Sequence, residues 1–231
     1  MIFLRPRSLF SCLTCIVLST GALHAQTPSQ SPSSSSSSSK RASKPVAPVD
    51  TALDAGAVTN GVYRNKTLGL SCKIPEAWVL RTDEMNASAD AKDNGNPAGT
   101  PAQSDGGKVL LAAFARPPEA KGEEINSSIL IAAESAAAYP GLKDAAQYFG
   151  PLTEVAKAQG FTVDEEPYEI AVGTKTLVRA DFHKDVGTRV MRQSTLAMLS
   201  HGYAVSITLI AGTDDDVEEL IDGLTFTATG K

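Results

Sequence analysis

The stretch from Thr188 to Ala211 constrains the fold more than any other part of the sequence. Two alternating runs flank His201-Gly202, and an X-Gly pair in that position is typical of a two-residue hairpin turn. The register that follows pairs Leu196 with Ile207, Met198 with Val205 and Ser194 with Leu209 on one face, and Thr195 with Thr208 and Ala197 with Ser206 on the other. The first face is mostly apolar and the second mostly polar. A slip by one residue would exchange the two faces, so the pattern itself favours this register.

A second hairpin is predicted just before the first. Residues 176–184 alternate, with Val178, Ala180 and Phe182 on one side and Arg179, Asp181 and His183 on the other. Asp185-Val186-Gly187 fits a three-residue loop with glycine in the left-handed position. This loop predicts that Phe182 faces Val190, His183 faces Arg189 and Arg179 faces Gln193.

The two predicted registers place a set of polar side chains on one face of the sheet, and we predict a binding role for this surface. Its members are Arg179, Asp181, His183, Arg189, Gln193, Thr195 and Thr208. Asp181 lies diagonal to Arg189 in this register, within reach of a cross-strand ion pair. Two arginines and a histidine around one carboxylate suit an anionic group on a partner, because guanidinium groups pair with carboxylates or phosphates. The alternative is an ordinary sheet face that is either solvated or covered by a neighbouring layer.

Motifs that would identify an enzyme are missing from the sequence. It contains no GxSxG, GxGxxG, P-loop or HExxH pattern. Asp181 and His183 share a face, but two ligands are too few for a closed zinc site. We therefore predict neither a cofactor nor a metal. A hydrolase that uses His183, with or without a metal, is the alternative to a binding protein.

The first 59 residues predict an exported protein on a disordered tether. Residues 1–25 begin with Arg5 and Arg7, continue with a short apolar run and end at Ala25, as a secretory signal does. The run is short for a membrane span. Residues 26–59 are rich in serine and proline and lack the apolar residues that could offset chain entropy. The expected location is periplasmic or secreted, with no stable membrane span once the signal is removed.

One folded domain is predicted for residues 60–231. Short strands from Gly61 onward end at Pro75, and a flexible loop is expected at 82–107, where the sequence is polar. Residues 108–115 and 128–133 are apolar on both faces, as strands covered on both sides are. Helices are expected at 142–159, divided or kinked at Gly150-Pro151, and after Thr213. The predicted class is α+β, with a mainly antiparallel sheet between helical layers in an α/β/α sandwich.

Cysteine usage and charge limit the possible partners. Cys12 and Cys15 fall in the signal, which leaves Cys72 as the one cysteine of the mature chain, on the apolar side of a strand. We expect it to be a buried small hydrophobe and not a nucleophile. The chain has 21 Lys and Arg against 26 Asp and Glu, a formal net charge of −5, and no basic stripe. Nucleic acid is therefore not an expected partner.

The order of these short motifs also resembles a known family. The chain resembles the opening of the PsbP-like, or Mog-type, α/β/α sandwich at Tyr63, Asn65, Leu68-Gly69-Leu70-Ser71, Ile74-Pro75 and Trp78. The Gly160-Phe161 step, the Val172-Gly173 turn and the final hairpin and helix continue the likeness, which covers residues 61–226. The resemblance implies a mostly non-catalytic protein, since the family includes lumenal photosystem II subunits, a Ran-binding adaptor, secretion chaperones and uncharacterised bacterial proteins. It implies no shared catalytic set.

The sequence therefore favours an exported binding or accessory protein that is not an enzyme. Its expected partner is a protein or an anionic component of the cell envelope. The contact is predicted at Arg179, Asp181, His183, Arg189 and Gln193.

The first prediction concerns export. The mature protein should begin at Gln26, because the apolar run ends in a small residue at Ala25. N-terminal sequencing of protein recovered from the exported fraction measures this directly. An intact Met1 on protein recovered from the cytosol would contradict it.

Overall fold

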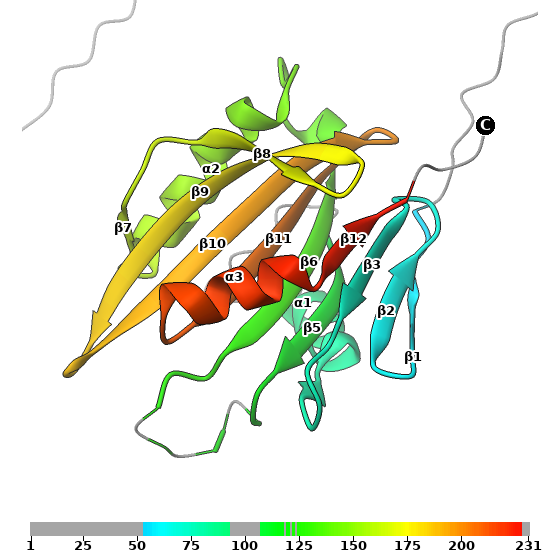
Figure 1. Cartoon of the computed structure of the whole chain (residues 1–231). Helices are drawn as coiled ribbons and strands as arrows, with labels where there is room; N and C mark the ends of the chain where they lie inside the picture. Colours follow the sequence, from blue (N-terminus) through cyan, green and yellow to red (C-terminus); the bar gives the residue numbers. More distant parts are fainter. Residues whose placement is uncertain (1–52, 93–106, 118, 121, 123, 228–231) are drawn as a thin grey trace, which may run out of the picture. The chain divides into compact units, whose positions relative to one another are not determined.

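The computed structural model describes residues 53–92, 107–117, 119, 120, 122 and 124–227 (Figure 1). The predicted signal and residues 26–52 of the predicted linker lie outside these residues, whereas residues 53–59 of that linker are described and include a short strand. Most of the predicted loop, residues 93–106, lies outside them as well.

An eight-stranded antiparallel sheet forms the larger part of the described chain. Its strand order is β4-β5-β6-β11-β10-β9-β7, and β8 pairs with β9 beside β7. Its strands are β4 (Val79–Leu80), β5 (Lys108–Phe114), β6 (Ser128–Ser135), β7 (Thr162–Val163), β8 (Tyr168–Val172), β9 (Lys175–Val186), β10 (Arg189–Ser200) and β11 (Tyr203–Ala211). The two longest are β9 and β10, with twelve residues each, and they carry the predicted site.

The β10–β11 hairpin has the register that the sequence predicts. Leu196 lies opposite Ile207, and the other four predicted pairs are also present. His201 and Gly202 form the turn, with φ angles of 53° and 79°. Two successive residues with positive φ are what a type I′ turn requires, and its twist matches that of the strands.

The predicted β9–β10 register is wrong by three residues. Val186 lies opposite Arg189, so the turn is the two-residue pair Gly187-Thr188 and not a three-residue loop. His183 consequently faces Arg192 instead of Arg189. An odd shift moves every residue of β10 to the other face relative to β9. The predicted polar surface is therefore divided between the two faces of the sheet.

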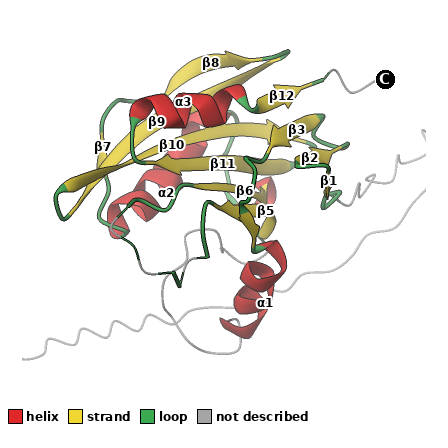
Figure 2. Cartoon of the chain, turned by 60° about the horizontal axis from the view of Figure 1, so that its bottom comes forward, coloured by secondary structure: helices red, strands yellow, loops and turns green. Residues whose placement is uncertain are grey.

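A second, four-stranded sheet was not predicted. It runs β1-β2-β3-β12 and is also antiparallel, with strands β1 (Ala57–Thr59), β2 (Val62–Asn65), β3 (Leu70–Lys73) and β12 (Leu224–Phe226). This small sheet and helix α3 (Asp214–Asp222) share one buried cluster with one face of the large sheet. Helix α2 (Ala145–Ala158) packs on the opposite face, as Figure 2 shows.

The predicted α/β/α sandwich is therefore wrong. The described residues form twelve strands in two sheets and three short α-helices, with a single 3-10 turn at Ala136–Ala138. The large sheet is covered on both faces, as its apolar strands require. On one of these faces, however, much of the cover is the small sheet. Apolar periodicity shows that a strand needs cover but does not show what covers it.

Helix α1 (Thr82–Lys92) begins where the sequence predicted a loop. Its side chains complete the backbone pairing of β5, which β4 covers only at one end. The Asn86 amide accepts from the Val109 N–H at 3.0 Å and donates to the Val109 carbonyl at 2.9 Å. The Thr82 hydroxyl accepts from the Ala112 N–H at 2.9 Å. Helix α1 thus covers the part of the β5 edge that β4 leaves unpaired, which limits pairing of this edge with other chains.

Several local predictions are confirmed. The Thr213 hydroxyl caps α3 by accepting from the Asp216 N–H at 3.1 Å. The predicted central helix is α2, although Pro151 lies within it and does not divide it. Cys72 is fully buried, and burial raises the pKa of its thiol to about 12, as expected for a packed and unreactive side chain.

The turn between β8 and β9 joins the two sheets. Gly173 has a φ of 59°, and a Cβ at this position would lie 3.2 Å from the backbone nitrogen and oxygen of Phe226 on β12. The neighbouring Thr174 hydroxyl donates to the Phe226 carbonyl at 3.1 Å. A side chain at this position would be both tightly packed against β12 and strained by the positive φ, which glycine adopts without cost.

The second prediction tests this contact with two glycines. Gly173→Ala should destabilise the protein by about 2 to 4 kcal/mol, from left-handed strain plus a steric clash. Gly187 has a φ of 64° with nothing within 4 Å, so Gly187→Ala should cost only about 1 to 2 kcal/mol of strain. Denaturant unfolding measures both. Equal losses would show that β12 can yield to the added methyl group.

Candidate functional site

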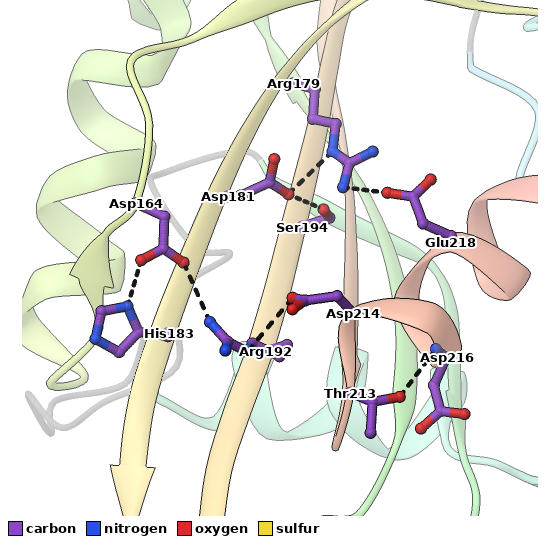
Figure 3. A network of polar contacts seen from close by, with 10 residues as sticks. All are labelled: Asp164, Arg179, Asp181, His183, Arg192, Ser194, Thr213, Asp214, Asp216 and Glu218. Atoms are coloured by element: carbon purple, nitrogen blue, oxygen red, sulfur yellow. Dashed lines mark hydrogen bonds and ion pairs between the residues drawn. The ribbon is translucent and has the colours of Figure 1, made fainter.

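The corrected register assembles a polar cluster on the α3 side of the large sheet. We call it the sheet–α3 network and define it by Asp164, Tyr168, Arg179, Asp181, His183, Arg192, Ser194, Asp214 and Glu218. Asp181 of β9 faces Ser194 of β10, and His183 faces Arg192. Figure 3 shows these side chains, except Tyr168, spread across β9 and β10 toward α3. All of the network residues except His183 and Glu218 line a hollow of about 300 Å³.

Asp181 is the acceptor at the centre of the network. Its carboxylate accepts from Arg179 Nε at 2.9 Å, from the Tyr168 hydroxyl at 2.8 Å and from the Ser194 hydroxyl. Burial, together with the hydrogen bond to Asp181 and its charge, raises the pKa of Tyr168 to about 12. The phenol therefore stays protonated at neutral pH and remains a donor. Three strands, β8, β9 and β10, meet at this one carboxylate.

Arg179 extends the network to α3. Its Nη2 lies 2.6 Å from a carboxylate oxygen of Glu218, and its guanidinium lies 5.9 Å from the centre of the Tyr168 ring. The side chain is only 13% exposed. Burial lowers the pKa of Arg179, but hydrogen bonds to Glu218 and Asp181 outweigh it and raise the pKa. Arg179 is therefore a charged residue that connects the large sheet to α3.

The outer part of the network is looser. The Asp164 carboxylate pairs with His183 Nδ1 and lies 3.8 Å from Arg192 Nη1. Arg192 Nε lies 3.4 Å from Asp214, a side chain that is 76% exposed. Long ion pairs of exposed groups contribute at most about 1 kcal/mol.

Not all the predicted site residues come together. Arg179, Asp181 and His183 share the network, as their alternation on β9 predicts. Arg189 lies opposite Val186 beside the hairpin turn. Gln193 is buried on the other face, where its amide donates to Thr195 at 3.2 Å. Sequence reasoning missed Arg192 and Ser194, which a two-residue turn at Gly187-Thr188 would have placed correctly.

Every carboxylate of the network has a basic partner within it. Four carboxylates, those of Asp164, Asp181, Asp214 and Glu218, surround two arginines, and each arginine contacts two of them. An incoming anion would have to displace a carboxylate already in place. Anion binding at these arginines therefore stays a prediction. The ion pairs of Arg179 with Glu218 and of Arg192 with Asp214 hold α3 against the large sheet, and we call this arrangement the clamp.

The geometry of the network provides no catalytic pair. The Ser194 hydroxyl donates to Asp181 and not to His183, so no serine of the network is placed next to a histidine base. Within the described part of the chain, no group of three His, Cys, Asp or Glu side chains could hold a metal ion.

A larger cleft lies on the other flank of α3, and sequence reasoning did not foresee it. We call it the α3 cleft. Its volume is about 960 Å³. One wall is α3, and the other is the segment from the end of β3 to β4. Apolar lining comes from Val62, Ile74, Pro75, Trp78, Ala211 and Leu220. Trp78 is partly buried against the core and is the only tryptophan of the chain.

Carboxylates dominate the charge of the α3 cleft. Its charged lining residues are Lys73, Glu76, Asp216, Glu219 and Asp222. Among the described residues, none of the four acidic side chains makes an ion pair or accepts a side-chain hydrogen bond. The last turn of α3 carries no basic residue. The cleft carboxylates therefore have no basic partner among the described residues, whereas each carboxylate of the sheet–α3 network has one.

Backbone strain occurs in the wall opposite α3. Ala77, between Glu76 and Trp78, has a φ of 64°. The left-handed region costs a non-glycine residue roughly 1 to 2 kcal/mol. Ala77 therefore connects two residues that line the cleft, Glu76 and Trp78.

Comparison with known proteins yields no assignment. No known protein family matches the chain, and no curated protein sequence matches it. The resemblance to the PsbP-like family thus gains no support. Among the described residues, no helix has both the length and the apolar composition to cross a bilayer.

Three solved structures show a weak likeness. LpqN of Mycobacterium tuberculosis, involved in cell envelope biogenesis, is 12% identical, with 68% of this chain and 83% of that chain covered and a TM-score of 0.36. A Bacteroides thetaiotaomicron protein is 12% identical, with 70% and 46% covered and a TM-score of 0.35. PA94 of Pseudomonas aeruginosa, of unknown function, is 16% identical, with 68% and 85% covered and a TM-score of 0.33. Such scores assign neither a family nor a function.

The third prediction tests the clamp. Asp181→Asn should destabilise the protein by about 2 kcal/mol, because it weakens three hydrogen bonds to a charged acceptor. The control, Asp214→Asn, removes an exposed charge from the same network and should cost less than about 1 kcal/mol. Unfolding in denaturant compares them. A neutral Asp181→Asn would show that the clamp does not stabilise the fold.

Proposed function

We propose that this protein is an exported binding module, not an enzyme, and that it holds a cationic group of a partner in the α3 cleft. The observation that carries the proposal is the set of four carboxylates, without ion pairs among the described residues, in a cleft that is also lined by apolar side chains and the only tryptophan. Export itself remains the prediction made from residues 1–25.

The physical case rests on uncompensated charge in a concave surface. Carboxylates in a cleft with low-dielectric walls focus a negative potential and attract cations. Glu219 and Asp222 lie in the last turn of α3, where the helix dipole disfavours negative charge by about 0.3 to 1 kcal/mol each. Stability alone would not favour this arrangement, whereas binding a cation would relieve it. Apolar lining around a few polar groups is typical of ligand sites.

The sheet–α3 network supports this proposal indirectly. Its ion pairs fix the far flank of α3 to the large sheet, while Val217, Leu220 and Ile221 pack in the core. The wall of the cleft that carries the acidic row is thereby held in place. The sequence favoured an anionic partner group. With the arginines engaged by carboxylates, the free charge on this side of the molecule favours a cationic one.

No arrangement among the described residues favours the alternative, a hydrolase that uses His183. His183 is paired with Asp164, and no nucleophile is placed beside it. An accessory role through binding is therefore the function that the geometry supports best.

The fourth prediction tests the sign and place of the contact. A triple variant, Glu76→Gln, Glu219→Gln and Asp222→Asn, should weaken capture on a poly-L-lysine surface by about tenfold or more at low salt, equivalent to about 1.4 kcal/mol. Added salt should reduce the difference, because it screens exposed charges. Surface plasmon resonance on the full mature chain measures the binding.

A matched control removes the same number of charges elsewhere. Glu165→Gln, Glu166→Gln and Glu169→Gln alter exposed residues outside the cleft. This variant should change capture by less than about threefold, because distant exposed charges are largely screened. Equal losses in the two triple variants would mean that only net charge matters and would remove the cleft from the proposal. A thermal unfolding midpoint for each variant verifies that it is folded.

A further inference from the structure

We propose that the occupant of the α3 cleft is an extended peptide segment of a partner protein with the pattern basic–apolar–basic. This inference rests on the proposed function and specifies the partner. It depends on two further features of the cleft, namely the spacing of its acidic residues and the unlike chemistry of its two walls.

The acidic wall presents a row and not a single point. Asp216, Glu219 and Asp222 follow each other at three-residue steps along α3, and all line the cleft. With a rise of about 1.5 Å per residue, the row is about 9 Å long. In an extended peptide, residues two apart project on the same side and are separated by about 6.6 to 6.8 Å. Two basic side chains at positions i and i+2 therefore fit along the row, and a single amine would use only part of it.

The opposite wall is largely apolar. Ile74, Pro75 and Trp78 line it, with Glu76 as its charged member. Successive side chains of an extended chain point in opposite directions. When the two basic residues face α3, the residue between them faces Trp78 and Pro75, and an apolar side chain gains most there.

The size of the cleft fits a peptide better than a small amine. Small-molecule sites occupy about 300 to 1,000 Å³, and the α3 cleft, at about 960 Å³, is near the upper end of that range. A diamine would leave most of the apolar wall exposed to water. A short peptide covers that wall and satisfies the acidic row together.

Trp78 gives a direct measure of occupancy. Because it is the only tryptophan of the chain, its fluorescence reports on the cleft when tryptophan-free ligands are titrated into the full mature protein. The probes are acetyl-Ala-Lys-Leu-Lys-Ala-amide, its isomer acetyl-Ala-Lys-Lys-Leu-Ala-amide, and the diamine putrescine. The alternating peptide should bind at least about fivefold more tightly than either of the others, because only it matches both walls.

Variants connect this preference to the acidic row. In Glu219→Gln/Asp222→Asn, the preference for the alternating peptide should fall to less than about twofold. In Glu165→Gln/Glu166→Gln, a control outside the cleft, it should persist. Persistence in the first variant would overturn the assignment of α3 as the wall that reads the basic residues.

The outcomes separate this inference from the proposed function. Equal affinity for all three probes, lost in Glu219→Gln/Asp222→Asn, would overturn the peptide inference and leave a general cation site standing. No fluorescence response to any probe would also overturn the inference, and poly-L-lysine capture would then decide the proposed function by itself. The proposed function fails if the cleft triple variant leaves capture unchanged, or weakens it no more than the matched control does.

Discussion

The position of α3 depends on the contacts that the Asp181 carboxylate makes. A partly buried negative charge must be satisfied by several donors, and here Arg179, Tyr168 and Ser194 supply them from three strands. Arg179 then reaches Glu218 and connects the satisfied carboxylate to the helix. The same helix packs in the buried cluster that the two sheets share. Electrostatic satisfaction and apolar packing therefore select the same position for α3.

The two flanks of α3 contrast in how their charge is compensated. On the network side, Asp214 and Glu218 have arginine partners. On the cleft side, Glu219 and Asp222 have none among the described residues, although both lie at the helix end that disfavours them. Charge that does not serve stability is a reasonable place to look for function, because proteins tend to break local rules at functional sites. The molecule thus separates a structural charge cluster from a candidate binding surface across one helix.

Sequence reasoning succeeded at one hairpin and failed at its neighbour for a physical reason. Along β10–β11, Leu196 and Ile207 belong to long alternating patterns that only one register can bury together. Near the β9–β10 turn, residues 189–193 mix polar and apolar side chains on both faces, so burial does not distinguish registers. The choice then depends on the turn alone, and both a three-residue loop and Gly187-Thr188 fit the local residues. This error hid Arg192 from the candidate site.

The sequence by itself determined the local elements: the type I′ hairpin at His201-Gly202, the cap at Thr213 and the burial of Cys72, because turn preference, capping and alternation are encoded in neighbouring residues. Tertiary structure alone decided which distant segments meet. The pairing of β12 with β3 joins segments about 150 residues apart, and it creates the second sheet that excludes an α/β/α sandwich. The α3 cleft is formed in the same way, between Trp78 and Leu220. No periodicity records such pairings, because they depend on which surfaces remain uncovered after the local elements have formed.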